Sequence, residues 1–447
     1  MIRKHTGSIA SVRGLLLAAL LVVICPMGLL ATDGHFLRGS GPVNEAMGGA
    51  DAGIGLDATG SIAWNAACAT QFKGRRFEIH GTIFTPWRSL SSTVDANAFG
   101  AGMPGATLSG TTVSKTDTSL MPGLAFIYHP NGSANAYSVA MLAVSGFGVD
   151  YAANTDFSNP ILTPQAPNGF GFGRIRSNYM LVTVPLGIAR QLNDRLSIGA
   201  EALPALSMLQ VIPAPFSAPV MGGSTMPYYL DAGNNAPAMG FGFNVGMHYK
   251  ASDAVTFGVA YHSPVWFQQF TWKRRDLANA LHTLNFTMDL PQVVTFGVGL
   301  TPAKGTRIGV DARYFDYANT KGFDKVGYTA TGAAAGFGWN SIWSAGGGIE
   351  QSVTKATKVI VGYNYSENPV PAQYTFFNTP APAIVQHHIS GGLVQKVAGW
   401  DVNVTYYHAF KNSITGPWIG SSGPIPGTSV TSSMSENSVT IGLGKSF

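Results

Sequence analysis

The chain has 447 residues, of which 45% are hydrophobic and only 11% are charged, and its formal net charge is +5. A water-soluble protein of this length would carry about 25% charged residues, and a helical membrane protein would show apolar runs of about 20 residues. After residue 31 the sequence has no such run. Its charge gives no basic footprint for nucleic acid. Abundant glycine and aromatic residues without long apolar runs favour a transmembrane β-barrel, in which only alternate strand residues face lipid.

The first 31 residues have the features of a cleaved secretory signal peptide. Three basic residues precede an uncharged core, Gly14–Ile24, and Ala31 is the expected cleavage position. Because this segment holds three basic residues and no acid, its removal lowers the formal charge from +5 to near +2. A retained membrane anchor is the alternative, which Pro26 disfavours because it interrupts the apolar run.

Cysteine usage predicts no internal disulfide. The chain has two cysteines, Cys25 and Cys68, and Cys25 lies in the segment that we expect to be removed. One thiol would then remain, although passage through the periplasm would permit disulfides.

Residues 32–75 differ from the rest of the chain. They are rich in Gly and Ala, show no alternation, and include a short helix-like piece at Asn44–Ala50. Since they precede the first predicted strand, we expect them to form a hatch inside the barrel, which then comprises residues 76–447.

The barrel region is a series of alternating segments separated by clusters of Gly, Pro, Asn, Asp and Ser. The eighth segment requires a long strand bent at Pro291. An even number is what closed bacterial barrels need. The fourteen predicted strands lie near 77–87, 122–129, 137–147, 177–190, 195–209, 240–250, 255–270, 282–300, 306–315, 342–351, 357–366, 387–397, 400–410 and 437–447.

The last strand shows the alternation most clearly. In Ser438–Phe447, one face carries Val439, Ile441, Leu443 and Phe447, and the other carries small or polar residues. Segments 241–249, 307–315 and 400–410 repeat this pattern. A soluble all-β sandwich is the alternative, but it would need far more charge on its solvent face.

The charged residues of segment 307–315 lie on the strand face opposite the aromatic one, as expected if the charged face points into a water-filled lumen. Asp311 and Arg313 could orient a carboxylate, but at i and i+2 they are neighbours on one face, so we expect them to pair with each other or with the hatch. Intervals 88–121, 150–176, 210–239 and 411–436 are long and polar or rich in Pro and Gly, which predicts extracellular loops.

Four features follow one another in a characteristic order: the Gly-rich segment Gly39–Ala67, Leu290-Pro291, the stretch from Asn368 and the terminal Phe447. The motif of the first segment comprises Asn44, Met47, Gly48, Gly49, Asp57 and Asn65. Together these features resemble the FadL/TodX family of outer-membrane channels for hydrophobic compounds. Gly39–Ala67 is similar to that family's hatch, with Ala66 in place of the usual Pro.

The resemblance implies a fourteen-stranded monomeric barrel in the bacterial outer membrane that takes up hydrophobic small molecules passively. Cargo would enter a pocket near the hatch N-terminus and leave to the outer-membrane lipid through a gap at a kink in the third strand. The implied path residues are Phe36, Leu37, Gly146, Phe147 and Gly148. Paired glycines suit a bulged strand; the alternative, which the sequence favours slightly, is that they are ordinary small residues that face the lumen beside a loop. Long-chain fatty acid is the first candidate cargo, and an aromatic hydrocarbon or alkane is the second. The resemblance further implies that the barrel assembly machinery of the outer membrane recognises the C-terminal Phe447.

Other functions find less support in the sequence. His387 and His388 point to opposite strand faces and cannot chelate one metal together, so we expect neither a metal nor another cofactor. No Ser/His/acid set stands out for an outer-membrane hydrolase, which predicts a protein without enzymatic activity. A hydrophilic porin and a structural or adhesive barrel remain as alternative functions.

Overall fold

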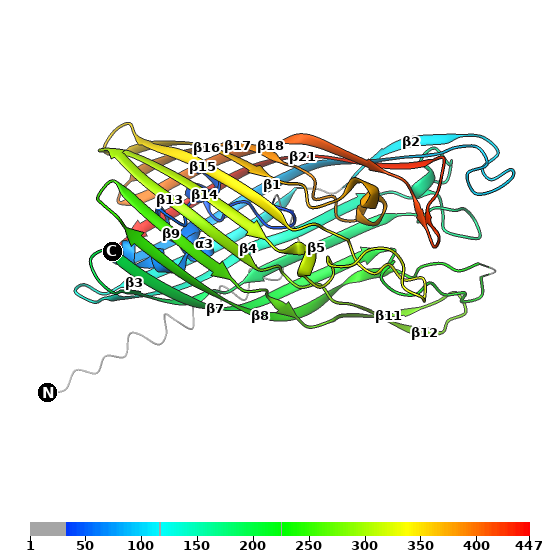
Figure 1. Ribbon diagram of the computed structural model, residues 1–447, viewed down its shortest axis with the longest axis horizontal. Helices are drawn as coiled ribbons and strands as arrows, with labels where there is room; N and C mark the ends of the chain where they lie inside the picture. Colours follow the sequence, from blue (N-terminus) through cyan, green and yellow to red (C-terminus); the bar gives the residue numbers. More distant parts are fainter. Residues whose placement is uncertain (1–32, 116–117, 225) are drawn as a thin grey trace.

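The computed structural model describes residues 33–447 except 116–117 and 225, and the predicted signal peptide lies outside these residues. It shows one barrel with its axis horizontal in Figure 1 and short helices inside one end. The helices are α2 (Pro42–Ala46), α3 (Ala58–Trp64) and the 3-10 turns η1 (Ala66–Gln71), η2 (Pro160–Leu162), η3 (Tyr317–Asn319) and η4 (Ala372–Asn378). The strands are β1 (Gly74–Val94), β2 (Leu108–Val113), β3 (Ser119–His129), β4 (Asn135–Tyr151), β5 (Ile175–Thr183), β6 (Leu186–Gln191), β7 (Leu196–Ile212), β8 (Ala232–Lys250), β9 (Val255–His262), β10 (Trp266–Phe267), β11 (Phe270–Arg275), β12 (Leu281–Phe286), β13 (Val293–Ala303), β14 (Thr306–Phe315), β15 (Ile342–Ser352), β16 (Thr357–Ser366), β17 (His387–Val397), β18 (Trp400–Gly416), β19 (Ile419–Gly420), β20 (Gly423–Pro424) and β21 (Thr428–Ser446).

The sheet closes because β1 pairs antiparallel with β21 from Arg76↔Ser446 to Val94↔Thr428. Several strands are successive pieces of one barrel position: β2 with β3, β5 with β6, β9 with β10 and β11, and β12 with β13. The wall therefore has fourteen positions, and the predicted fourteen-stranded antiparallel barrel is confirmed.

The eighth barrel position differs from its prediction. We expected one strand bent at Pro291, but β12 pairs with β11 alone, whereas β13 pairs with β9 and β14, and Pro291 lies between the two strands. Because proline donates no backbone hydrogen bond, it ends a central strand rather than bending it.

The predicted extracellular loops are partly wrong as well. Strand β1 extends to Val94, β7 to Ile212 and β18 to Gly416, and β2 lies entirely within the interval 88–121. These strands continue where lipid no longer demands an apolar outer face, so their pairing persists without the apolar outward side chains that mark a membrane strand.

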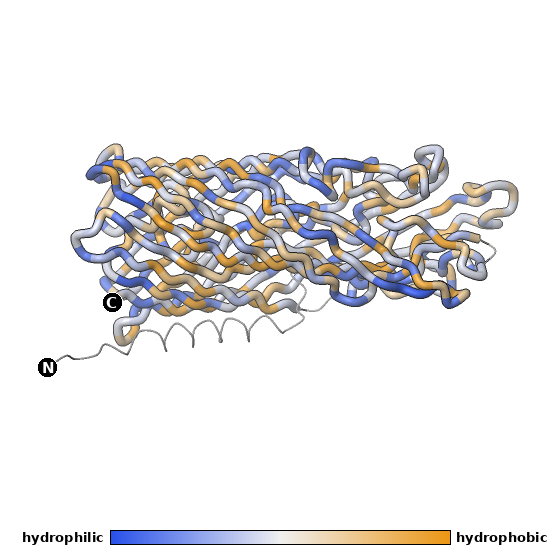
Figure 2. The backbone as a smooth tube through the Cα atoms, turned by 90° about the horizontal axis from the view of Figure 1, so that it is seen from below, coloured by the Kyte–Doolittle hydropathy of each residue, from blue (hydrophilic) through white to orange (hydrophobic). Residues whose placement is uncertain are grey.

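A belt of apolar side chains surrounds the barrel. Short turns and the C-terminus lie at the left end in Figure 1, and the long connections lie at the right end, which is the usual arrangement of periplasmic and extracellular ends. Figure 2 shows hydrophobic residues concentrated between hydrophilic ends. On β21, Val439, Ile441 and Leu443 are exposed, whereas Ser438 and Thr440 are buried, which confirms the predicted faces.

The segment 33–72, which we call the hatch, lies inside the periplasmic half of the barrel. Buried charges on β14 hold it there: Asp311 Oδ2 accepts hydrogen bonds from Asp51 N (2.9 Å) and Ala52 N (3.0 Å). Arg313 donates to the carbonyl oxygens of Arg38 (3.1 Å) and Gly49 and to Asp311 Oδ2 (3.2 Å). The prediction that Asp311 and Arg313 pair with each other or with the hatch is confirmed.

The hatch motif maintains the shape of this segment and its contact with the wall. Asn44 Oδ1 accepts from Ser40 N and Trp64 Nε1, and Asp57 caps α3 through Gly60 N. Asn65 Nδ2 donates to Ala52 O (2.8 Å) and, across to β8, to Met247 O (3.0 Å). The remaining motif residues are buried at the wall: Met47, Gly48 and Gly49.

Gly48 shows how closely hatch and wall approach. Its φ is +69°, and a Cβ built there would lie 2.4 Å from the carbonyl oxygen of Tyr363 on β16. Only glycine fits this backbone conformation and this distance.

Candidate functional site

The backbone ladder of the barrel wall is interrupted between β3 and β4. Among the described residues, the ladder between these strands ends at Gly123↔Leu142. Within the described part of the chain, β4 meets the neighbouring position again at Asp150, whose carbonyl oxygen accepts from Lys115 N (2.8 Å) and whose N–H donates to Ser114 Oγ (3.0 Å). We call the edge of β4 between Ala143 and Val149 the wall gap.

On its other side, β4 is irregular at the start of the gap. Its register with β5 shifts between Ala143 and Ser145, so Val144 is a bulge. Gly146 and Gly148, which the sequence offered as the kink, pair regularly with Met180 and Asn178. The irregularity therefore begins just before these glycines.

A short stretch of the hatch, His35–Leu37, covers the wall gap from inside, and we call it the strap. Leu37 N donates to Val144 O (2.9 Å), Gly146 N donates to His35 O (3.0 Å), and Ser145 Oγ donates to the same carbonyl (2.7 Å). The strap thus acts as a short extra strand that satisfies part of an edge that β3 leaves unpaired.

A tight turn leads into the strap: the backbones of Asp33 and Phe36 exchange hydrogen bonds of 3.1 and 3.3 Å. The Tyr317 hydroxyl donates to Asp33 O (2.8 Å) and lies 2.9 Å from His35 Nδ1. The single hydroxyl proton of Tyr317 is donated to the Asp33 carbonyl oxygen, so the hydroxyl oxygen can only accept from His35. In a neutral His35 ring the proton is therefore on Nδ1. Burial lowers the pKa of His35 to about 3, in agreement with that neutral form.

The His35 ring is surrounded by aromatic side chains. It stacks on Tyr179, with ring centroids 6.0 Å apart, and Tyr179 stacks on Phe147 at 5.1 Å. Phe323 and Trp339 close the other side, with centroids 4.8 and 5.8 Å from His35. The strap is therefore anchored by apolar packing as well as by hydrogen bonds.

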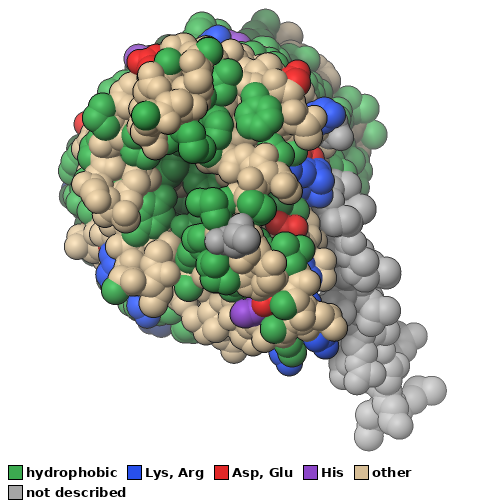
Figure 3. Space-filling model, turned by 90° about the vertical axis from the view of Figure 1, so that its right-hand side faces the viewer, with side chains coloured by type: hydrophobic (Ala, Val, Ile, Leu, Met, Phe, Trp, Pro, Cys, Tyr) green, Lys and Arg blue, Asp and Glu red, His purple; other side chains and the backbone are tan. Residues whose placement is uncertain are grey.

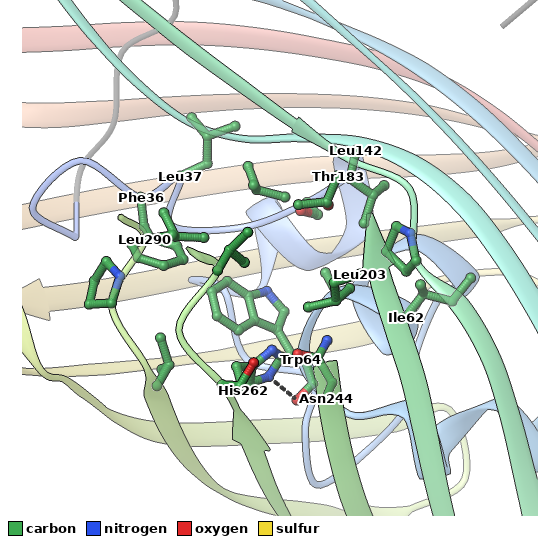
Figure 4. A pocket seen from close by; sticks show the side chains of 18 residues that line it. Phe36, Leu37, Ile62, Trp64, Leu142, Thr183, Leu203, Asn244, His262 and Leu290 are labelled. Carbon is green, nitrogen blue, oxygen red and sulfur yellow. Dashed lines mark hydrogen bonds between the residues drawn. The ribbon is translucent and has the colours of Figure 1, made fainter. Parts of the chain in front are cut away.

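Below the strap lies an apolar cavity of about 570 Å³, the inner cavity. Phe36 and Leu37 of the strap and Trp64 of the hatch line it, together with wall residues at the gap such as Leu142 and Val144. Figure 4 shows the Trp64 indole at the centre of these side chains. The charge nearest to that indole is the Arg313 guanidinium, whose carbon lies 3.6 Å from the ring centroid.

Two further apolar cavities, each of about 440 Å³, lie toward the long connections. The middle cavity is lined by aromatic side chains that include Phe147, Phe216 and Phe337. The outer cavity shares Pro215, Ala334, Phe377 and Pro380 with it. In Figure 3 the extracellular end shows a hollow surrounded by hydrophobic side chains.

The predicted path residues fall into two groups. Phe36 and Leu37 line the inner cavity, and Phe147 lines the middle cavity. Gly146 bonds to the strap, and Gly148 lies in regular ladder register. Their role in transport stays a prediction.

The residues that join the strap to the barrel were not predicted from the sequence; they are His35, Val144, Ser145, Tyr179 and Tyr317. They lie on four separate segments, and only the alternation of Tyr179 within its strand offered a signal.

Comparison with known proteins identifies the family. The model of the family described as outer membrane protein transport protein (OMPP1/FadL/TodX) matches residues 40–382. The chain belongs to this family. Membership places the barrel in the bacterial outer membrane and makes it a transport protein for hydrophobic compounds. No curated protein sequence matches the chain.

Solved structures agree in fold. The toluene transporter TodX of P. putida superposes with a TM-score of 0.65 at 15% identity, covering 92% of this chain and 99% of that one. The toluene transporter TbuX of Ralstonia pickettii gives 0.65 at 16% identity, with coverage of 92% and 99%. A FadL homologue from Pseudomonas aeruginosa gives 0.66 at 11% identity, with coverage of 93% and 100%. At these identities the likeness concerns the fold alone.

Proposed function

We propose that this family member carries hydrophobic molecules from the extracellular end to the wall gap and releases them sideways into the membrane, without an energy source. The observation that supports this route best is the succession of apolar cavities from the outer through the middle to the inner cavity, which adjoins the gap. A ligand gains about 25 cal/mol for each Å² of apolar surface buried, so apolar walls capture it without other driving forces.

The strap is the proposed gate. Its His35 ring packs against Tyr179, which in turn packs against Phe147 of the middle cavity, while Phe36 lines the inner cavity. A molecule passing between these two cavities must displace the strap, and the displaced strap also uncovers the edge of β4. The same movement would open the path and the exit.

For the cargo, we propose long-chain fatty acids first. A long apolar chain can occupy successive cavities, which a compact molecule does not need. Aromatic hydrocarbons are the second candidate, because the middle cavity is rich in phenylalanine and, among the described residues, no Lys, Arg, Asp or Glu lines any of the three cavities.

A disulfide lock tests the gate. Phe36 and Ser145 are bridge partners in antiparallel pairing, a spacing of about 4.5–5.5 Å between Cα atoms that a disulfide can span. In a Cys68→Ser background, Phe36→Cys with Ser145→Cys should block uptake when oxidised and restore it after reduction.

A matched control places the same lock elsewhere on β4. Ile127 and Ser138 are partners in the regular ladder between β3 and β4, so Ile127→Cys with Ser138→Cys should leave uptake unchanged in both redox states. Uptake that is indifferent to the strap lock would refute the gate.

Radiolabelled oleate and toluene, supplied to a transport-deficient diderm host that expresses the chain, separate the two cargo classes. Faster entry of oleate than in the host alone supports the first candidate, and faster entry of toluene supports the second. No gain for either cargo, with the folded barrel present in the outer membrane, would refute hydrophobic transport.

A further inference from the structure

A buried arginine without a partner lies in the lumen above the hatch. Arg88 is on the inner face of β1, and its side chain is only 1% exposed. Among the described residues, its Nε, Nη1 and Nη2 atoms have no hydrogen-bond partner. A guanidinium has five N–H donors, and an unpaired buried charge is strongly unfavourable.

Its surroundings are apolar along the strand and polar across it. On the same face of β1, Phe84 and Leu90 belong to buried hydrophobic clusters on either side of Arg88. Across the ladder Arg88 stands opposite Met434, so Ser432 and Glu436 lie diagonally on each side. The hydroxyls of Ser432 and of Tyr151 on β4 likewise have no partner.

Glu436 does not neutralise Arg88 by direct contact. Within the described part of the chain, no ion pair within 4 Å joins the two residues, and Tyr407 donates its hydroxyl proton to Glu436 Oε2. Of the residues that the structure describes, the acceptors left for the five guanidinium N–H groups are one free oxygen of Glu436 and the two hydroxyl oxygens, which are themselves without a partner.

Arg88 also lies at the extracellular rim of the wall gap. Ser114 N donates to Arg88 O (2.9 Å), and Asp150 N on β4 donates to Ser114 Oγ (3.0 Å). These bonds close the wall directly beyond the gap edge, Ala143–Val149. A group held by Arg88 would thus lie where the opening begins, with the strap and the inner cavity on the periplasmic side.

We propose that Arg88 is a head-group site, which binds the carboxylate of an amphiphilic cargo at the rim of the wall gap while the apolar tail enters the gap. The planar guanidinium fork matches two carboxylate oxygens, and the Tyr151 and Ser432 hydroxyls are additional donors. This inference rests on the proposed function and adds to it the feature that would select acids over hydrocarbons.

Paired ligands with one tail test the proposal. Binding of tritiated oleate and of tritiated oleyl alcohol is measured on outer membranes that contain the wild-type chain, Arg88→Leu or Arg88→Lys. Arg88→Leu should weaken oleate binding about tenfold or more, because a charge-assisted bidentate contact is lost, and leave oleyl alcohol within about twofold. Arg88→Lys, which keeps the charge without the fork, should fall between them.

Arg75→Leu is the matched control, since Arg75 is exposed at the opposite end of β1; it should bind both ligands as the wild type does. Glu436→Gln tests whether Arg88 serves only as the counter-ion of Glu436. If so, Arg88→Leu would lower the heat stability of the barrel, Glu436→Gln would restore it, and oleate binding would not change.

Unchanged oleate binding by a folded Arg88→Leu barrel would overturn the head-group site, and so would equal losses for both ligands, which indicate a structural role. If Arg88→Leu does not fold, Arg88→Lys decides, because oleate binding as strong as in the wild type excludes a bidentate contact. A wild-type barrel that neither binds nor carries any hydrophobic ligand would refute the proposed function itself, a result distinct from these.

Discussion

Replacing Arg313 by methionine should release the hatch from the wall. In the barrel Arg313 is 2% exposed, donates to two hatch carbonyls and to Asp311, and stacks on the Trp64 ring. Methionine keeps much of the volume against that ring and removes every donor. Breaking a buried pair costs about 3–5 kcal/mol. We expect the lower end, since two backbone N–H groups still bind Asp311.

A loss of about 3 kcal/mol corresponds to roughly a hundredfold more frequent opening of the hatch. Hydrogen exchange of peptides covering residues 46–57, followed by mass spectrometry, measures this directly. In a Cys25→Ser background, maleimide labelling of the buried Cys68 should accelerate in parallel. Arg307→Met is the control, because Arg307 lies on the same strand and pairs with Glu350 of the wall. Exchange in Arg313→Met within twofold of the wild type would refute the latch.

Three further predictions concern the hatch. Gly48→Ala should lower the temperature at which the folded band on a gel converts to the unfolded band, because the new Cβ would clash with the carbonyl oxygen of Tyr363. Gly100→Ala is the control, since Gly100 also has a positive φ but a Cβ there would meet no atom within 4 Å. Burial raises the pKa of Glu45 to about 7, so the folded barrel favours the protonated form of this side chain. The free energy of unfolding should therefore be greatest below the ordinary glutamate pKa and fall as pH rises through about 7. Glu45→Gln should flatten this part of the dependence of stability on pH. Asp57→Ala should cost about 1 kcal/mol through loss of the α3 cap, visible as faster exchange in its first turn.

The strands could be predicted because lipid acts on every one of them in the same way. A side chain facing the membrane must be apolar and its neighbour in the lumen need not be, so Phe241, Val245 and Tyr249 on β8 alternate with buried Asn244 and His248. That constraint is local along the chain. It also revealed Asp311 and Arg313, whose charges could face only the lumen.

Beyond the membrane the constraint ends, and so did the accuracy of the prediction. The interval 88–121 was predicted to be a loop, which concealed the continuation of β1 to Val94 and the inward direction of Arg88. The sequence did contain a signal for this continuation. Trp87 is exposed and lies beneath the Lys411 ammonium, and Arg88 is buried, so the two residues extend the alternation of the preceding strand residues.

The strap could not be predicted for a different reason. Its attachment to β4 consists of backbone hydrogen bonds between residues about a hundred positions apart, and any residue except proline can donate such a bond. Nothing in the side chains of Leu37 or Val144 specifies that pairing. The side chains determine it indirectly, because His35 fits an aromatic surround and Gly34 permits the preceding turn with φ +69°.

The prolines of the wall explain why the inner cavity lies at this level of the barrel. Pro185 separates β5 from β6, Pro264 separates β9 from β10, and Pro291 precedes β13. Each removes a ladder donor, so the regular ladder is interrupted at that residue. Pro185 and Pro291 line the cavity, and Pro264 lies between its lining residues Ser263 and Val265. Pro185 lies beside β4, because its carbonyl oxygen accepts from Ala140 N (3.1 Å), whereas Pro264 and Pro291 lie farther around the wall, where the bridge between Val265 and Leu290 still pairs the backbones. The interrupted ladders therefore border the inner cavity from two sides of the barrel, and the strap and Trp64 fill it from inside.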